Sequence, residues 1–250
     1  MRATSLYARE AIWDYSNARS RFFFLHYSRI LSFLQGLLYK SKKIEYNIGD
    51  IVNGECKSMR DEHLTETCAA SKSVFEGKIL HVFVDDINLP NGERGFREYI
   101  KHIGAVAVLP LTDDGRVICV RQYRYAVGEV TLEIPAGKLD SPDEDPREAA
   151  LRELREETGA RCKSLVELGT YLASPAILDE KIKLYLARDL DFGETDPDDD
   201  EFIDVVALPF AEMVDRVMAG DILDGKTQLA VLKVQELLRR EEAQKETEMK

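Results

Sequence analysis

The sequence predicts an α+β protein. Three observations support this prediction. Short runs that alternate apolar and polar residues fill the region from residue 71 to residue 138, helical patterns occur singly, and no strand–helix–strand unit repeats along the chain. The 250 residues are 44% apolar and 32% charged, which is typical of a soluble globular domain.

The strand-rich region begins with an antiparallel meander, predicted over residues 71–103. Asn91-Gly92 interrupts the alternation there and is a strong hairpin-turn signal. Asp113-Asp114-Gly115 lies between apolar runs at 104–111 and 116–123, so it predicts another hairpin. A further strand is expected to end near Pro135 and Gly137.

A helix is predicted to start after Asp145, which can cap its N-terminus, with Pro146 at the first helical position. Gly159 stands where a left-handed C-terminal cap is needed. Beyond it, we expect strands at about 164–172, 181–189 and 202–208, followed by two helices at about 210–219 and 225–241.

Acidic residues cluster on one face of the first helix. Glu153, Glu156 and Glu157 stand at positions i, i+3 and i+4, which share one side of a helix, while Ala150 and Leu154 offer an apolar opposite side. Like charges placed this way destabilise a helix by a few tenths of a kcal/mol per pair. The plain interpretation is a solvated acidic face. The alternative is an all-oxygen metal site, which prefers Mg²⁺ or Mn²⁺ to zinc.

Two neighbours favour the metal interpretation. Glu144 lies just before the helix, so its carboxylate can return toward the acidic face. Arg152 can either pair with Glu148 one turn earlier or hold one of the acidic-face carboxylates in place.

This segment resembles the signature of the Nudix hydrolases, G-x5-E-x7-R-E-U-x-E-E-x-G-U, where U is apolar. The chain from Glu144 to Ala160 matches it in order, with Arg152-Glu153-Leu154, Glu156-Glu157 and Gly159 at the required spacing. One departure is visible, because six residues and not five separate Gly137 from Glu144. An added loop residue costs little free energy, but it makes the position of Glu144 less certain.

The resemblance implies a Nudix fold, in which a mixed β-sheet packs between α-helices, here with an N-terminal antiparallel strand region. It implies hydrolysis of a phosphoanhydride bond with Mg²⁺, for which Mn²⁺ is a possible substitute. Glu153 and Glu157 are implied to be the main metal ligands, with Glu156 and the backbone carbonyl of Ala136 as further ligands. Arg152 is implied to orient the catalytic carboxylates.

Features outside the signature resemble the ADP-ribose pyrophosphatase branch of this family. Pro175 follows Ala160 by 15 residues, and Arg121, Arg124 and Glu133 are substrate-binding candidates. Each also has a plainer interpretation, namely a loop proline or ordinary ion pairs between surface strands.

An acidic run near residue 200 also resembles this branch, which carries a catalytic base in a mobile loop. Glu201 is the candidate base, and Asp198, Asp199 and Asp200 are alternatives. Such a run is otherwise an ordinary solvated loop.

The implied activity is hydrolysis of ADP-ribose to AMP and ribose 5-phosphate. Two alternatives stay open. One is a Nudix hydrolase of another nucleoside diphosphate compound, such as an ADP-sugar, a GDP-sugar or NADH. The other is a non-catalytic Nudix module that senses ADP-ribose, although complete metal ligands argue against it.

Charge and composition divide the chain into three parts. Residues 1–58 carry nine Lys and Arg against five Asp and Glu, and they are interpreted as an extra segment. The open alternatives are translation from upstream of an initiator at Met59, which predicts a poorly ordered segment, and an amphipathic surface helix or transit-like segment. Residues 59–103 form the strand region, which the resemblance implies is exchanged in a homodimer, and residues 104–250 form the hydrolase domain.

Composition also limits partners and location. The net charge of −12 argues against nucleic-acid binding, and no apolar run is long enough for a membrane span. Four widely spaced cysteines without a zinc pattern suit the cytoplasm.

Overall fold

The computed structural model describes residues 61–196 and 202–249. The proposed extra segment 1–58, Met59 and the acidic residues Asp198–Glu201 therefore lie outside the described residues. Among the helices of the described part, none is both long enough and apolar enough to cross a bilayer.

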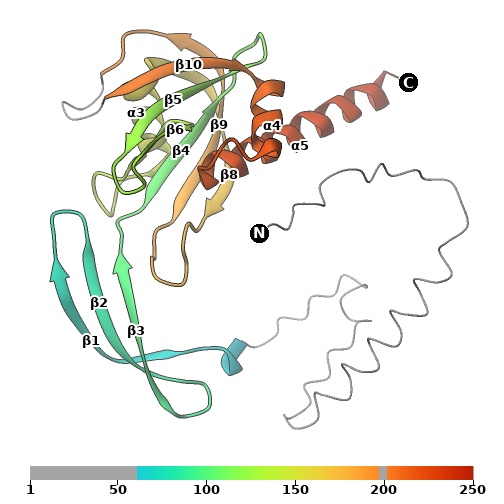
Figure 1. Cartoon of the computed structure of the whole chain (residues 1–250). Helices are drawn as coiled ribbons and strands as arrows, with labels where there is room; N and C mark the ends of the chain where they lie inside the picture. The colour runs from blue at the N-terminus through green and yellow to red at the C-terminus, as the bar shows by residue number, and fades with distance from the viewer. Residues whose placement is uncertain (1–60, 197–201, 250) are drawn as a thin grey trace, which may run out of the picture. The chain divides into compact units, whose positions relative to one another are not determined.

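The first sheet is an antiparallel meander with strand order β1-β2-β3, after a short 3-10 turn at Asp61–His63 (Figure 1). Its strands are β1 (Thr67–Glu76), β2 (His81–Asn88) and β3 (Arg94–Lys101). The turn at Gly92 joins β2 to β3, as the sequence predicts, with a φ of 85° that favours glycine. All ten positions of β1 are exposed, so nothing in the described chain covers this edge strand.

A four-stranded mixed sheet forms the centre of the fold, in the order β7-β4-β9-β8. It comprises β4 (Ala105–Pro110), β7 (Ala136–Lys138), β8 (Ala160–Tyr171) and β9 (Ile182–Phe192). The pair β4–β9 is parallel, and the other two pairs are antiparallel. A third sheet, in the order β10-β5-β6, comprises β5 (Arg116–Arg124), β6 (Glu129–Glu133) and β10 (Ile203–Pro209).

The turn at Asp113-Asp114-Gly115 is present, but the expected hairpin is not. Gly115 adopts a φ of 78° and closes the turn by donating to the carbonyl of Thr112. The flanking strands then separate into different sheets, and Leu111↔Val117 is a single isolated bridge between them. The reason is that both edges of β4 are already paired, one with β7 and the other with β9.

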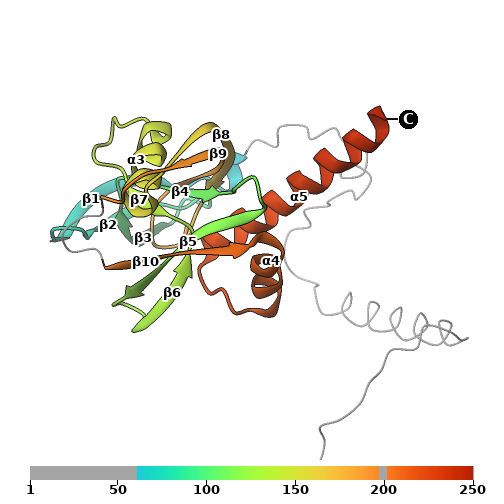
Figure 2. The same cartoon turned by 90° about the horizontal axis from the view of Figure 1, so that it is seen from above.

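Strand β4 is buried on both faces, and its two faces contribute to different cores. Ala105, Ala107 and Leu109 pack into the core that includes residues of α4 (Phe210–Ala219) and α5 (Gly225–Glu248). Val106 and Val108 pack with α3 (Pro146–Thr158). Helices therefore cover both faces of the mixed sheet (Figure 2), and the expected α+β fold with a mixed sheet between helices is confirmed.

Helix α3 begins and ends where local chemistry predicts. The side chain of Asp145 accepts from the backbone N–H of Arg147, Pro146 is the first helical residue, and Gly159 adopts a left-handed cap with a φ of 69°. Its apolar side, which includes the fully buried Ala150 and Leu154, packs on the sheet. Glu153 and Glu157 are buried on this same side of the helix, next to β7, and not on the opposite side as expected from the sequence.

Helix α5 is longer than the sequence predicts, since it continues from residue 241 to Glu248. Arg188 of β9 donates two hydrogen bonds to Glu241, at 3.0 and 3.2 Å, which ties this part of the helix to the sheet. That long-range pair fixes the helix at residue 241, where the predicted helix ends, and a local pattern does not reveal it.

Candidate active site

Two carboxylates of α3 lie against the backbone of β7. Glu153 and Glu157 are 8% and 3% exposed. The backbone N–H of Ala136 donates to Glu157 Oε2 at 3.1 Å. A Cβ built on Gly137 would lie 2.1 Å from Glu153 Oε1, so only glycine lets this carboxylate rest there. The two buried acids thus face one short strand.

Arg152 joins the remaining acids of this cluster. Its Nη1 donates to Glu153 Oε1 at 2.7 Å and to Glu156 Oε2 at 3.1 Å, and its Nε donates to Glu144 Oε1 at 3.3 Å. Its Nη2 also donates to the carbonyl of Lys138 at 3.1 Å. Of the two expected roles for Arg152, the structure therefore shows it holding the acidic-face carboxylates and not pairing with Glu148.

The six-residue spacing before Glu144 does not prevent it from reaching the cluster. Glu144 Oε2 accepts from the backbone N–H of Asp140, and this bond, together with Arg152, lowers the pKa of Glu144. Burial lowers the pKa of Arg152, but its bond to Glu144 and the charge of Glu153 outweigh burial and raise it. The carboxylate of Glu144 and the guanidinium of Arg152 are consequently charged at neutral pH.

A pocket of about 320 Å³ lies beside β7. Ala136, Gly137 and Lys138 of β7 line one part of it, and Arg124, Asp224 and Lys226 line another. The pocket thus joins the strand that contacts the buried carboxylates to the basic side chains of Arg124 and Lys226, the second of which is bonded to the acidic Asp224. Such a combination suits a ligand with phosphate groups.

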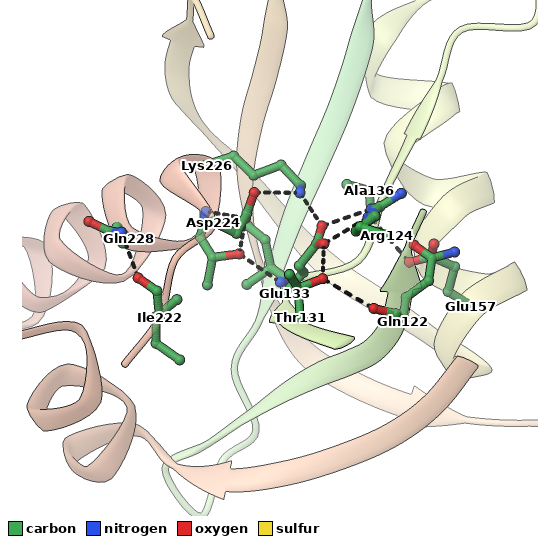
Figure 3. A network of polar contacts seen from close by, with 12 residues as sticks. Gln122, Arg124, Thr131, Glu133, Ala136, Glu157, Ile222, Asp224, Lys226 and Gln228 are labelled. Atoms are coloured by element: carbon green, nitrogen blue, oxygen red, sulfur yellow. Dashed lines mark hydrogen bonds and ion pairs between the residues drawn. The ribbon is translucent and has the colours of Figure 1, made fainter. Parts of the chain in front are cut away.

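Arg124 is held in the pocket by a buried acid. Its Nε and Nη2 donate to the two carboxylate oxygens of Glu133, both at 2.8 Å (Figure 3). Glu133 also accepts from Thr131 Oγ1 at 2.6 Å and from Lys226. Burial alone raises the pKa of Glu133, but Arg124 and Lys226 outweigh it and lower the pKa to about 2.

The sequence and the fold are similar to those of known proteins. A family model, the NUDIX domain, matches residues 101–226, which is half of the chain. The chain belongs to the Nudix family.

Its relatives match about two thirds or more of the chain. An ADP-ribose pyrophosphatase of Bacillus subtilis (strain 168) is 39% identical over 170 residues, which are 67% of this chain and 91% of that protein. A methanol dehydrogenase activator of Bacillus methanolicus is 40% identical over 178 residues, 70% of this chain and 96% of that protein. A crystal structure of an ADP compounds hydrolase is similar with a TM-score of 0.63 and 26% identity, covering 71% of this chain and 96% of that one.

Nudix hydrolases generally use divalent metal ions. Within 61–196 and 202–249, no three His, Cys, Asp or Glu side chains are arranged as metal ligands. The guanidinium of Arg152 lies among the acids instead. The residues nevertheless suit a hard divalent cation, because every acidic donor is an oxygen and Gly137 lets the Glu153 carboxylate lie against β7, close to the contact between Ala136 and Glu157.

The other expected site residues lie in different places in the structure. Arg124 and Glu133 are in direct contact. Arg121 projects from the opposite face of β5 and lies 3.5 Å from the exposed Asp204. Pro175 is exposed in the turn between β8 and β9. Ala173 and Glu180, which lie in the same connection, line the pocket. Glu201 is outside the described residues.

Sequence reasoning missed two residues of the pocket, Asp224 and Lys226. Both belong to the first turn of α5, where Asp224 is the N-cap and accepts from the backbone N–H of Thr227 at 2.9 Å. The signal that marks Asp224 is its capping position before a helix. Nothing local identifies Lys226, since its partner Glu133 is 93 residues away.

The pKa of Glu133 predicts an acid-dependent stability. A carboxyl whose pKa falls from 4.5 to about 2 on folding stabilises the protein above pH 4.5 and loses that contribution as the pH falls toward 2. Glu133→Gln is expected to lower the free energy of unfolding at pH 7 by on the order of 3 kcal/mol, and by clearly less at pH 3. Urea unfolding at both pH values measures this, with the exposed Glu129→Gln as control. A pH-independent difference would contradict the assignment.

Proposed function

We propose that this Nudix hydrolase cleaves the pyrophosphate bond of ADP-ribose in the presence of Mg²⁺, giving AMP and ribose 5-phosphate. The observation that carries the proposal is that β7, whose residues contact the buried Glu153 and Glu157, also lines the pocket in which Arg124 lies. The relatives named ADP-ribose pyrophosphatase and ADP compounds hydrolase support ADP-ribose as the substrate.

In this proposal, Glu153 and Glu157 are the main metal ligands, and Glu156 and the carbonyl of Ala136 are further ligands. Their support is the burial of two carboxylates against β7. Bound Mg²⁺ supplies neutralisation of phosphate charge and a lower pKa for water.

The chain's own residues perform the remaining tasks. Arg152 keeps Glu153 and Glu156 in position through the bonds described above. Arg124 binds the anionic part of the substrate, where a guanidinium offers directed donors. We retain Arg121, Glu133 and Pro175 as further substrate-binding candidates, and Glu201 as the candidate base that deprotonates the attacking water.

The test is incubation of the purified full chain with ADP-ribose, with and without Mg²⁺, and identification of the products. The expected result is AMP and ribose 5-phosphate only when Mg²⁺ or Mn²⁺ is present. A panel with an ADP-sugar, GDP-mannose and NADH then measures selectivity as kcat/KM. If kcat/KM were tenfold or more higher for another compound, that compound would replace ADP-ribose as the proposed substrate. Tight binding of ADP-ribose without cleavage would indicate a sensing module.

We further propose a cytoplasmic homodimer in which the β1–β3 sheet contacts the second copy. Support comes from β1, whose ten residues are all exposed, and from exposed apolar side chains at Val74, Phe75 and Phe96. Sedimentation of the full chain is expected to give twice the mass of one chain, and Phe75→Lys with Phe96→Lys is expected to shift it toward the monomer. A monomeric wild-type chain would contradict this.

A further inference from the structure

Lys226 is a buried cation that the proposed chemistry does not use. Only 9% of the residue is exposed. Its Nζ donates to Glu133 and, at 2.9 Å, to Asp224 Oδ1. A buried ammonium is stable only when it is paired with hydrogen-bonding acids, and Lys226 has two of them.

The position of Lys226 is itself fixed from two sides. Asp224 caps α5 through Thr227, and the hydroxyl of Thr227 accepts from the backbone N–H of Ile134 at 2.9 Å. Ile134 immediately follows Glu133 in the chain. The first turn of α5 is thus attached to the end of β6 by two bonds. One is the hydrogen bond from Ile134 to Thr227, and the other is the ion pair between Lys226 and Glu133 (Figure 3).

On its other side, Glu133 sets the direction of Arg124. Both of its oxygens accept from Arg124, through Nε and Nη2, which leaves the Nη1 edge for a ligand. Arg124 lines the pocket, and its side chain is 43% exposed, whereas that of Glu133 is only 4% exposed. A two-bond contact fixes the plane of a guanidinium as well as its position.

We propose that Lys226 is a positioning residue, which holds Glu133 so that Glu133 can hold Arg124 in the orientation that binds the substrate's phosphate. Without Lys226, the remaining partners of Glu133 among the described residues lie on β5 and β6, so the pair Arg124–Glu133 can move together. This inference rests on the proposed function, because it assigns the effect of Lys226 to the binding of a nucleoside diphosphate compound.

Direct contact of Lys226 with the phosphate is the competing explanation, since Lys226 also lines the pocket. Positioning is favoured because Nζ is already bonded to two carboxylates, whose charges offset its own. An ammonium in this setting attracts an additional anion weakly.

A double-mutant cycle separates the two explanations. Lys226→Met is expected to raise KM for ADP-ribose about tenfold and to change kcat less than threefold, as expected when ground-state binding is lost. In an Arg124→Ala background, the same change is expected to alter KM less than twofold, because Arg124 is no longer there to be positioned. Lys226→Arg is expected to restore KM to within about threefold of the wild type.

Lys233→Met is the matched control. Lys233 is another lysine of α5, but its Nζ donates to the carbonyl of Leu168, away from this pocket. It is expected to leave KM unchanged. Melting temperatures of all variants identify any that fail to fold.

Three outcomes would overturn the proposal. Independent effects of Lys226→Met and Arg124→Ala would show that Lys226 contacts the substrate itself. A fall in melting temperature with no change in KM would show a structural role alone, and a loss confined to kcat would show a role in the chemical step. Binding of ADP-ribose by the same variants in EDTA, measured by calorimetry, repeats the cycle without turnover. An inactive wild type therefore counts against the proposed function and leaves the coupling measurable.

Discussion

Glu157→Gln is expected to lower kcat for ADP-ribose hydrolysis by about a thousandfold or more while leaving the fold intact. The side chain of Glu157 is buried beside Ala136, in the cluster that we propose binds Mg²⁺. Glutamine keeps the size and one carbonyl oxygen, which can still accept from the N–H of Ala136. It lacks the negative charge, which the proposed metal and its transition-state stabilisation require.

The matched control is Glu148→Gln, which removes a charge from an exposed position on the same helix. Both variants are expected to melt within a few degrees of the wild type, and only Glu157→Gln is expected to lose turnover. Product formation at saturating Mg²⁺ measures the difference. If Glu157→Gln retained a tenth of the wild-type rate, the metal assignment would be wrong.

The fold was predictable where structure is decided by local chemistry. Helix α3 has its capping acid, its first-turn proline and its terminal glycine within 15 residues, so both of its ends were correctly predicted. The acidic face was predictable for the same reason, because a period of 3.6 residues places Glu153 and Glu157 together. The meander β1–β3 followed from alternation and from the turn at Gly92.

The rest depends on contacts that local patterns do not contain. The turn at Gly115 was predicted, but not the separation of β4 and β5, since that depends on β9 pairing with β4 from some 75 residues later in the chain. In the same way, an ion pair of Arg124 with a neighbouring acid was one expected alternative, but the sequence did not identify Glu133 as that acid. Lys226 completes that contact from 93 residues away, and sequence spacing gives no sign of it.

Gly137 of β7 lies directly against the carboxylate of Glu153, so a substitution there tests the same site. Gly137→Ala is expected to abolish most ADP-ribose hydrolysis, by about a hundredfold or more, with little loss of stability. The added Cβ would lie 2.1 Å from Glu153 Oε1, a distance at which something must move. The carboxylate at the end of a glutamate side chain moves easily, whereas the strand backbone does not. Glu153 is therefore displaced from β7, and the proposed ligand geometry is lost.

Gly95→Ala is the control, because it places a methyl group in a strand where the nearest atoms are 3.5 Å away. It is expected to keep full activity. Combining Gly137→Ala with Glu153→Asp gives a sharper test, since the shorter acid removes the clash. Recovery of part of the lost kcat would show that the two side chains compete for one place. If Gly137→Ala were instead to unfold the protein while Gly95→Ala did not, the close approach would be a requirement of the fold and not of the site.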